Sequence, residues 1–182
     1  MGRLKPSWDE RYRQGYGAGL APAPFVVEQL VWLPSEVALL DVAGGRGRHA
    51  IWAAQRGMDV TLVDGSSAAL ELAQRELPGL RTLQWDLEEH GLPPGAWDVL
   101  VVHHFLHRPL LAAAGDALQP GGLCIFVQPT TTNLERHPRP SRRFLVEPGE
   151  ARGLFGELEI VVYDESWRDD RHEARVVARR RA

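Results

Sequence analysis

Short apolar runs alternate along this chain with segments whose apolar residues have helical spacing. This alternation is typical of α/β proteins with a parallel sheet. The apolar runs predict strands at 37–40, 60–63, 80–84, 97–102 and 123–127, and a final hairpin at 158–163 and 173–178. The amphipathic segments predict helices at 8–13, 23–32, 48–56, 68–77, 110–118 and 150–155, with a proline-rich loop over 129–143. We therefore expect an α/β fold.

The first predicted strand ends at an acid and a glycine-rich turn. Asp41 closes the apolar run. The turn after it contains Gly44, Gly45 and Gly47 and leads directly into the next helix. Glycines permit the sharp turn and let backbone N–H groups approach a ligand at a helix N-terminus. A second acid, Asp64, ends the next apolar run. This layout is that of a nucleotide-cofactor pocket.

Two cofactors are compatible with this layout. The segment from Gly45 to Ala50 matches the dinucleotide fingerprint Gly-x-Gly-x-x-Ala, and Asp64 lies 19 residues after Gly45, where a ribose-binding acid is found. A carboxylate at Asp41, however, would repel a pyrophosphate. It suits a ligand with a cationic end, such as S-adenosylmethionine, which carries an ammonium and a sulfonium. A nicotinamide-dependent oxidoreductase is therefore the less favoured alternative.

Composition limits the remaining choices. The 182 residues are enough for one domain with its own core, and a net charge of −3 gives no overall attraction to nucleic acid or anionic membrane. No apolar run approaches the roughly 20 residues of a membrane span, and residues 1–6 lack the apolar stretch of a signal peptide. Cys124 is the only cysteine, so no internal disulfide can form. We predict a cytoplasmic protein without membrane association; the oligomeric state stays open.

Four motifs in order along the chain resemble those of the class I S-adenosylmethionine-dependent methyltransferases. The segment Asp41–Gly47 is similar to the family's first motif, with Ala43 in place of its first glycine. Asp64 matches the acid that holds the ribose, and Asp86 the acid that reads the adenine amino group. The turn 118–122, Leu-Gln-Pro-Gly-Gly, is similar to the family's turn before strand five.

The resemblance implies a single Rossmann-like three-layer domain. Its mostly parallel seven-stranded sheet has the order 3-2-1-4-5-7-6 and ends in an antiparallel hairpin. Residues 1–20 would form an N-terminal helix and lid, and residues 21–182 the methyltransferase domain. S-adenosylmethionine would be the cofactor and S-adenosylhomocysteine its product. The implied cofactor-binding residues are Asp41, Ala43, Gly44, Gly45, Gly47, Asp64, Gly65, Ser66, Asp86, Leu87 and His103.

Within that family the chain resembles the small tellurite-resistance and thiopurine-type methyltransferases. The segments that carry this likeness are 8–12, 104–111 and 144–150. The end of strand five often has a glutamate in related chains, whereas this chain has Gln128. The narrower resemblance implies a small-molecule acceptor and leaves its identity open.

Methyl transfer from a sulfonium is an in-line displacement, so the protein mainly has to align nucleophile and methyl group. A general base is needed only if the nucleophile carries a proton. His104 and His107, after strand four, are the candidates for that base, because the imidazole pKa is near neutral. The residues expected around the acceptor and in the lid are Tyr12, Tyr16, Arg108, Gln128 and Arg143. His103 and His107 are four residues apart and would share a helix face, but we expect no metal site there, since no cysteine or acid stands beside them and Arg108 would repel a cation.

The sequence leaves alternatives to a small-molecule methyltransferase. The Asn/Asp-Pro-Pro-aromatic motif of amine methyltransferases is absent after strand four, where His-His-Phe-Leu stands, so DNA is not an expected substrate. The basic loop 136–143 makes an RNA methyltransferase an alternative, less favoured than a small-molecule enzyme. A non-catalytic protein that only binds S-adenosylmethionine would have the same cofactor residues and is also kept as an alternative.

Overall fold

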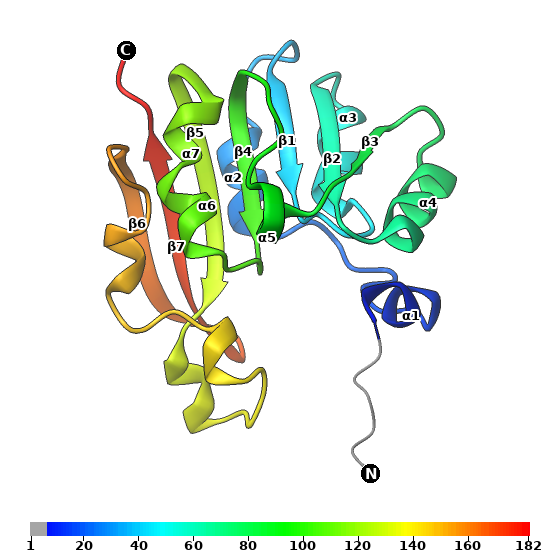
Figure 1. The fold of residues 1–182 in the computed structure, drawn as a ribbon. Helices are drawn as coiled ribbons and strands as arrows, with labels where there is room; N and C mark the ends of the chain where they lie inside the picture. Colours follow the sequence, from blue (N-terminus) through cyan, green and yellow to red (C-terminus); the bar gives the residue numbers. More distant parts are fainter. Residues whose placement is uncertain (1–6) are drawn as a thin grey trace.

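Seven strands form one sheet in the order β3-β2-β1-β4-β5-β7-β6 in the computed structural model, which describes residues 7–182 (Figure 1). The strands are β1 (Ala38–Val42), β2 (Asp59–Asp64), β3 (Arg81–Gln84), β4 (Trp97–His103), β5 (Leu118–Pro129), β6 (Glu159–Arg168) and β7 (Arg171–Arg179). The pairs among β1 to β5 are parallel, and β7 is antiparallel to both β5 and β6. The predicted fold class, strand order and C-terminal hairpin are confirmed.

Helices cover both faces of the sheet. The α-helices are α1 (Trp8–Arg13), α2 (Pro24–Leu30), α3 (Arg48–Ala54), α4 (Ser67–Glu76), α5 (Leu87–His90), α6 (Arg108–Ala112) and α7 (Ala114–Ala117). Three 3-10 helices follow β5: η1 (Thr131–Glu135), η2 (Arg142–Phe144) and η3 (Glu150–Gly153). Core residues of α2, α3 and α4 pack on one face, and those of α5, α6, α7 and η3 on the other.

The central strands are apolar on both faces because both faces are covered. In β4, Leu100 and Val102 belong to one hydrophobic cluster, and Val99 and Val101 to the other. This alternation explains why parallel strands appear in the sequence as continuous apolar runs. Burying each such side chain contributes about 1.5–3 kcal/mol to folding. The same alternation directs Asp41 of β1 toward the α3 face.

The carboxyl ends of the parallel strands lie at one edge of the sheet. In Figure 1, α1 and the segment 130–149 both project beyond this edge, on opposite sides of the sheet. In open α/β sheets ligands bind at this edge, near the point where the strand order reverses. Here that point lies between β1 and β4. The fold therefore places the glycine-rich turn after β1 at the expected binding position.

Several predicted boundaries are wrong. The single helix predicted at 110–118 is two short helices, and Leu118 belongs to β5 because it pairs with Trp97 of β4. The strand predicted at 37–40 continues to Val42, because β2 and β4 pair with it on both sides. Tertiary pairing overrides local propensity in both cases.

Other differences concern the C-terminal third. The hairpin strands are longer than predicted. The segment 150–155 is 3-10 rather than α-helical, and η1 and η2 interrupt the loop predicted at 129–143. The short helix α5 was not predicted. Residues 1–6 lie outside the described residues. They belong to the predicted lid segment, and they are the stretch that was compared with a signal peptide. Across residues 7–182, every helix is too short or too polar to span a membrane.

Candidate functional site

The glycine-rich turn after β1 has a left-handed backbone at three positions. Ala43, Gly45 and Gly47 have φ of 52°, 59° and 73°, and Gly47 is the N-cap of α3. A Cβ at Gly44 would lie 2.5 Å from both the Asp41 carboxylate and the Leu62 side chain. The substitution of Ala43 for the family's glycine is accommodated, but alanine adopts this φ only at a cost of about 1 kcal/mol or more. The turn is therefore a constrained backbone loop at the carboxyl edge.

Asp41 lies beneath this turn and is completely buried. Its Oδ2 accepts the backbone N–H of Ala50 at 3.0 Å, whereas its Oδ1 has no hydrogen-bond partner among the described residues. Burial raises the pKa of Asp41 from 3.8 to about 7, although the Ala50 N–H and the charge of Arg48 both lower it. Gly44 packs against this carboxylate, and the expected influence of Asp41 on a cationic ligand through its charge stays a prediction.

Asp64 connects the end of β2 to the glycine-rich turn. Its Oδ2 accepts the N–H of Gly45 at 2.9 Å, and its Oδ1 accepts the N–H of Ser66 at 2.8 Å. Burial raises the pKa of Asp64, and the N–H groups of Ser66 and Gly45 oppose that rise. Ser66 in turn caps α4 by accepting the N–H of Ala69, while Gly65 is exposed between the two. The acid thus holds two neighbouring turns in a fixed relative position.

Helix α1 lies against these turns. A capping box begins this helix, since Ser7 and Glu10 bond each other's backbone N–H groups. Asp9 accepts hydrogen bonds from the hydroxyl of Ser66 and the N–H of Ala68. Tyr12 is buried, and its hydroxyl occupies the space beside Gly45 where a Cβ would be. The predicted N-terminal segment therefore contacts the predicted cofactor residues; its movement as a lid stays a prediction.

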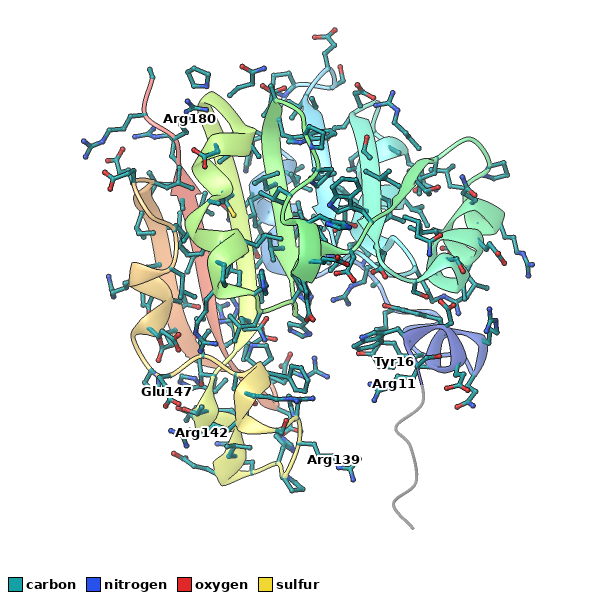
Figure 2. All side chains as sticks on the ribbon, in the orientation of Figure 1. Arg11, Tyr16, Arg139, Arg142, Glu147 and Arg180 are labelled. Atoms are coloured by element: carbon teal, nitrogen blue, oxygen red, sulfur yellow. The ribbon has the colours of Figure 1, made fainter. Side chains whose placement is uncertain are left out.

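The aromatic side chains of α1 and of the turn that follows it form a cluster. Tyr12 contacts Trp8 at a ring-centroid distance of 6.0 Å and Tyr16 at 5.6 Å. Trp8 and Tyr16 remain more than half exposed. Figure 2 shows Tyr16, in the turn after α1, and Arg139, on the 130–149 segment, well apart from each other beyond the carboxyl edge. Both segments therefore border the approach to the site.

Asp86 and Leu87 follow β3 at the same edge. The N–H of Trp85 bonds the carbonyl of Asp64 at 3.1 Å, which places Asp86 close to the Asp64 turn. The exposed Asp86 carboxylate caps α5 by accepting the N–H groups of Glu88 and Glu89, both at 3.0 Å. The Leu87 side chain is buried in the core.

Three histidines gather at the end of β4. The rings of His103 and His104 are 3.9 Å apart, and the ring of His49 on α3 is 4.9 Å from His103. His49 accepts the N–H of Ala23, and the guanidinium of Arg48 lies 3.0 Å from His103. Burial lowers the pKa of His49 to about 3 and holds that of His103 well below its usual value. These two imidazoles are therefore neutral near pH 7.

His104 is in a different environment. Its φ of 58° lies in the left-handed region, and its Nε2 lies 2.9 Å from Glu173 Oε1 on β7. Burial lowers the pKa of His104, while the hydrogen bond and the charge of Glu173 raise it. Glu173 was not among the residues predicted from the sequence. One pattern could have indicated it: charged residues stand at every second position of this strand, at 171, 173 and 175.

Two residues predicted for the acceptor side, His107 and Arg108, have structural partners instead. His107 accepts the N–H of Leu110 and caps α6. Arg108 forms a two-point pair with Glu150, at 2.5 and 3.1 Å. These contacts leave His104 as the candidate base. They also argue against an acceptor-binding role for Arg108.

The other two predicted acceptor residues lie on or beside the 130–149 segment. Gln128 is buried at the end of β5, where its amide donates to the carbonyl of Phe144 at 2.6 Å and its Oε1 has no partner among the described residues. Arg143 stacks on the Phe144 ring at 4.4 Å. Gln128 therefore attaches this segment to the sheet. Within residues 7–182, no three His, Cys, Asp or Glu side chains are arranged to hold a metal ion.

The chain is similar to known proteins in part of its sequence and in its fold. Residues 39–122 match the family described as "Methyltransferase domain". No curated protein sequence matches the chain. TehB from Haemophilus influenzae is similar in structure, with a TM-score of 0.74 and 18% identity over 95% of this chain and 66% of that one. This chain thus spans about two thirds of the length of that protein.

Two further solved structures are similar over nearly the whole chain. A TehB-like SAM-dependent methyltransferase from Corynebacterium glutamicum has a TM-score of 0.68 and 20% identity, over 96% of each chain. The 1,6-didemethyltoxoflavin-N1-methyltransferase from Burkholderia thailandensis, with its substrate and S-adenosylhomocysteine bound, has a TM-score of 0.66 and 21% identity, over 94% of this chain and 84% of that one. At these identities the likeness shows the fold.

Proposed function

We propose that the chain carries a class I S-adenosylmethionine-dependent methyltransferase domain and that it transfers the methyl group to a small-molecule acceptor by in-line displacement. The observation that carries the proposal is the arrangement at the carboxyl edge of β1 and β2. There Asp64 holds the Gly45 and Ser66 turns together above the buried Asp41. A cytoplasmic location stays a prediction from the single cysteine and the composition.

The residues present fit S-adenosylmethionine. Asp41 Oδ1 is a buried carboxylate oxygen with no hydrogen-bond partner among residues 7–182, and burial raises the pKa of Asp41 because the charged form lacks compensation there. A ligand with a cationic end would supply that compensation. A pyrophosphate at the same turn would add negative charge instead, which argues against a dinucleotide. Asp64 and Asp86 would hold the ribose and adenine ends, and the turn Ala43–Gly47 the amino-acid end.

When bound, S-adenosylmethionine supplies a methyl group already activated by the sulfonium charge. The chain's own contribution is to align the acceptor and to exclude water, which can supply much of the rate. The N-terminal segment, residues 8–19, is proposed to cover the cofactor through Tyr12 and Tyr16. Its glycines Gly15, Gly17 and Gly19, all at positive φ, would permit the movement.

We place the acceptor beyond the end of β4, between α1 and the 130–149 segment. His104 stands at this position and, as a neutral imidazole, can take a proton from the acceptor. The Burkholderia enzyme of the same fold acts on a small heterocycle, which supports an acceptor of that size class. The RNA alternative is weakened because Arg136 stacks on Trp167 and Arg142 pairs with Glu147, which occupies two of the loop's cationic side chains.

Calorimetric titration tests the proposal. We expect S-adenosylhomocysteine to bind and NAD not to bind under the same conditions. Incubation with methyl-labelled S-adenosylmethionine and a panel of thiols, hydroxy-heterocycles, amines and oxyanions of tellurium and selenium would then identify the acceptor. Binding of NAD without binding of S-adenosylhomocysteine would contradict the proposal. Cofactor binding with no turnover across the panel would favour the non-catalytic alternative.

A further inference from the structure

Glu173 lies where β7 passes the end of β5. It is opposite Pro129 on one side and Ser166 of β6 on the other, so its backbone is fixed by pairing on both edges. Its side chain is 14% exposed. One carboxylate oxygen, Oε1, contacts His104 Nε2 at 2.9 Å, and the other, Oε2, accepts from Arg175 at 3.0 Å. Both oxygens of this nearly buried carboxylate therefore have a hydrogen-bond partner.

Arg175 links Glu173 to a further acid, Asp164, on the side away from His104. Its guanidinium is 5% exposed and also bonds Asp164 of β6 at 2.8 Å. Although burial raises it, the pKa of Glu173 is lowered overall by the hydrogen bond from His104 and by the charge of Arg175. Glu173 is therefore ionised at neutral pH. A buried, ionised group with this many partners is held in one position.

An ionised carboxylate only accepts hydrogen bonds, so the nitrogen facing it must carry a proton. The neutral His104 ring then has its hydrogen on Nε2 and its lone pair on Nδ1. The other charged or titratable groups around His104 are Arg171 on β7, Arg48 and His49 on α3, and His103 on β4. Among these groups and Glu173, only the Glu173 carboxylate favours a proton on His104.

The backbone of His104 is also constrained. Its N–H donates to the carbonyl of Val127 at 2.9 Å, which ties the residue to the end of β5, and its φ is 58°. A non-glycine residue in this region costs about 1 kcal/mol or more and persists where surrounding contacts enforce it. Strain of this kind is concentrated at functional sites. The ring is thus held by its backbone, by the neighbouring tilted ring of His103 and by Glu173.

We propose that Glu173 is a positioning residue that fixes His104 as the Nε2–H tautomer, so that Nδ1 takes a proton from the methyl acceptor. The inference rests on the proposed function and narrows its substrate class: the acceptor's nucleophilic atom carries a proton, as in a thiol or a hydroxyl group. As that atom bonds to the methyl carbon, the carbon–sulfur bond breaks with its electron pair going to sulfur. The acceptor proton moves to Nδ1, and the resulting imidazolium pairs with Glu173 until it loses the proton to solvent.

The tautomer is tested without any turnover. Long-range ¹H–¹⁵N spectra of the full chain, with His104 assigned through His104→Gln, report which ring nitrogen is protonated and the pKa of the ring. We expect the Nε2–H form in the unmodified protein. Glu173→Gln should give mixed tautomers and a lower His104 pKa, because the carboxylate charge that favours the imidazolium is gone. The matched control Glu159→Gln, at the far end of the same hairpin, should change neither.

An Nδ1–H tautomer in the unmodified protein would overturn the proposal, as would an unchanged His104 tautomer and pKa in Glu173→Gln. If Glu173→Gln does not fold, the spectrum of the unmodified protein still decides the tautomer, and Glu173→Asp tests the carboxylate. Because these spectra need no cofactor, their result is independent of the S-adenosylhomocysteine titration that tests the proposed function.

Kinetics with an identified acceptor give a second test. General-base catalysis contributes about 100-fold or more, so His104→Ala should lose roughly that factor in kcat. Glu173→Gln should lose about tenfold in kcat, with the KM for S-adenosylmethionine unchanged and the acidic limb of the pH profile moved to lower pH. The double variant should be no slower than His104→Ala alone. An additive loss, or a loss confined to KM, would contradict a positioning role.

Discussion

The carboxylate of Asp64 accepts a hydrogen bond from the backbone N–H of Gly45, with 2.9 Å between Oδ2 and the nitrogen. This bond joins two turns that follow neighbouring parallel strands, and the other oxygen of the same carboxylate holds Ser66. The acid is thus part of the backbone framework of the site as well as a predicted ligand contact.

Asp64→Asn should weaken binding of S-adenosylhomocysteine at least tenfold. An asparagine side chain has one acceptor oxygen, so its amide group would face one of the two N–H donors and leave that donor unsatisfied, at a cost of about 1–3 kcal/mol. Calorimetric titration measures the affinity. Asp59→Asn is the matched control, because Asp59 begins the same strand at the opposite end, where it is half exposed and pairs with Arg81. Equal affinities for the two variants would count against the assigned role of Asp64.

Asp41→Asn should change how stability depends on pH. In the folded apo-protein the pKa of Asp41 is about 7, above its ordinary value of 3.8. A raised pKa means that the folded state holds the proton more tightly, so this contribution is fully present below about pH 4 and is lost as pH rises through about 7. Over this window the loss is on the order of 4 kcal/mol. Asp41→Asn keeps an acceptor for the Ala50 N–H but carries no titrating proton.

Urea unfolding of both proteins at pH 5 and pH 8 measures this effect. We expect Asp41→Asn to be more stable than the unmodified protein at pH 8 and to have lost most of that advantage at pH 5. The buried His49, with a pKa lowered to about 3, gives the opposite trend between about pH 3 and 6.5, but it is common to both proteins and cancels in the difference. A stability difference that does not vary with pH would show that Asp41 does not titrate in this range.

Gly45→Ala should destabilise the protein more than Gly79→Ala. Both glycines have positive φ, 59° and 88°, so alanine is strained at either position by about 1 kcal/mol. At Gly79 nothing lies within 4 Å of the added Cβ, whereas at Gly45 the Cβ would collide with the Tyr12 hydroxyl. We expect an additional loss of at least about 1 kcal/mol in thermal or urea unfolding for Gly45→Ala. Equal losses would mean that α1 is not packed on the turn in solution.

Arg108→Ala should leave turnover nearly unchanged. Arg108 was a predicted acceptor contact, but its guanidinium is paired with Glu150 and its side chain is 47% exposed. Loss of an exposed pair of this kind costs less than about 1 kcal/mol of stability. We expect the KM for the acceptor to change by less than about twofold. A tenfold rise in KM would show that Arg108 leaves Glu150 to bind the acceptor.

The boundaries that sequence analysis misplaced have a common cause. The helix predicted at 110–118 ends before Leu118, which pairs with Trp97 instead, and Asp41 is drawn into β1 by neighbours on both sides. In each case a long-range pairing outweighs a local preference of a few tenths of a kcal/mol. The glycine-rich turn was placed correctly because its chemistry is local: backbone geometry there depends on adjacent residues.

By itself the sequence determined where the predicted cofactor residues stand, because an acid, a glycine-rich turn and a second acid at the next strand end are read from neighbouring residues and their spacing. Only the tertiary structure brought together the residues that we propose for the acceptor side. His104 and Glu173 are 69 residues apart, and they meet because β7 enters the sheet antiparallel beside β5. The same packing assigned His107 and Arg108 to structural contacts. A contact between distant residues depends on sheet register, which local patterns do not encode.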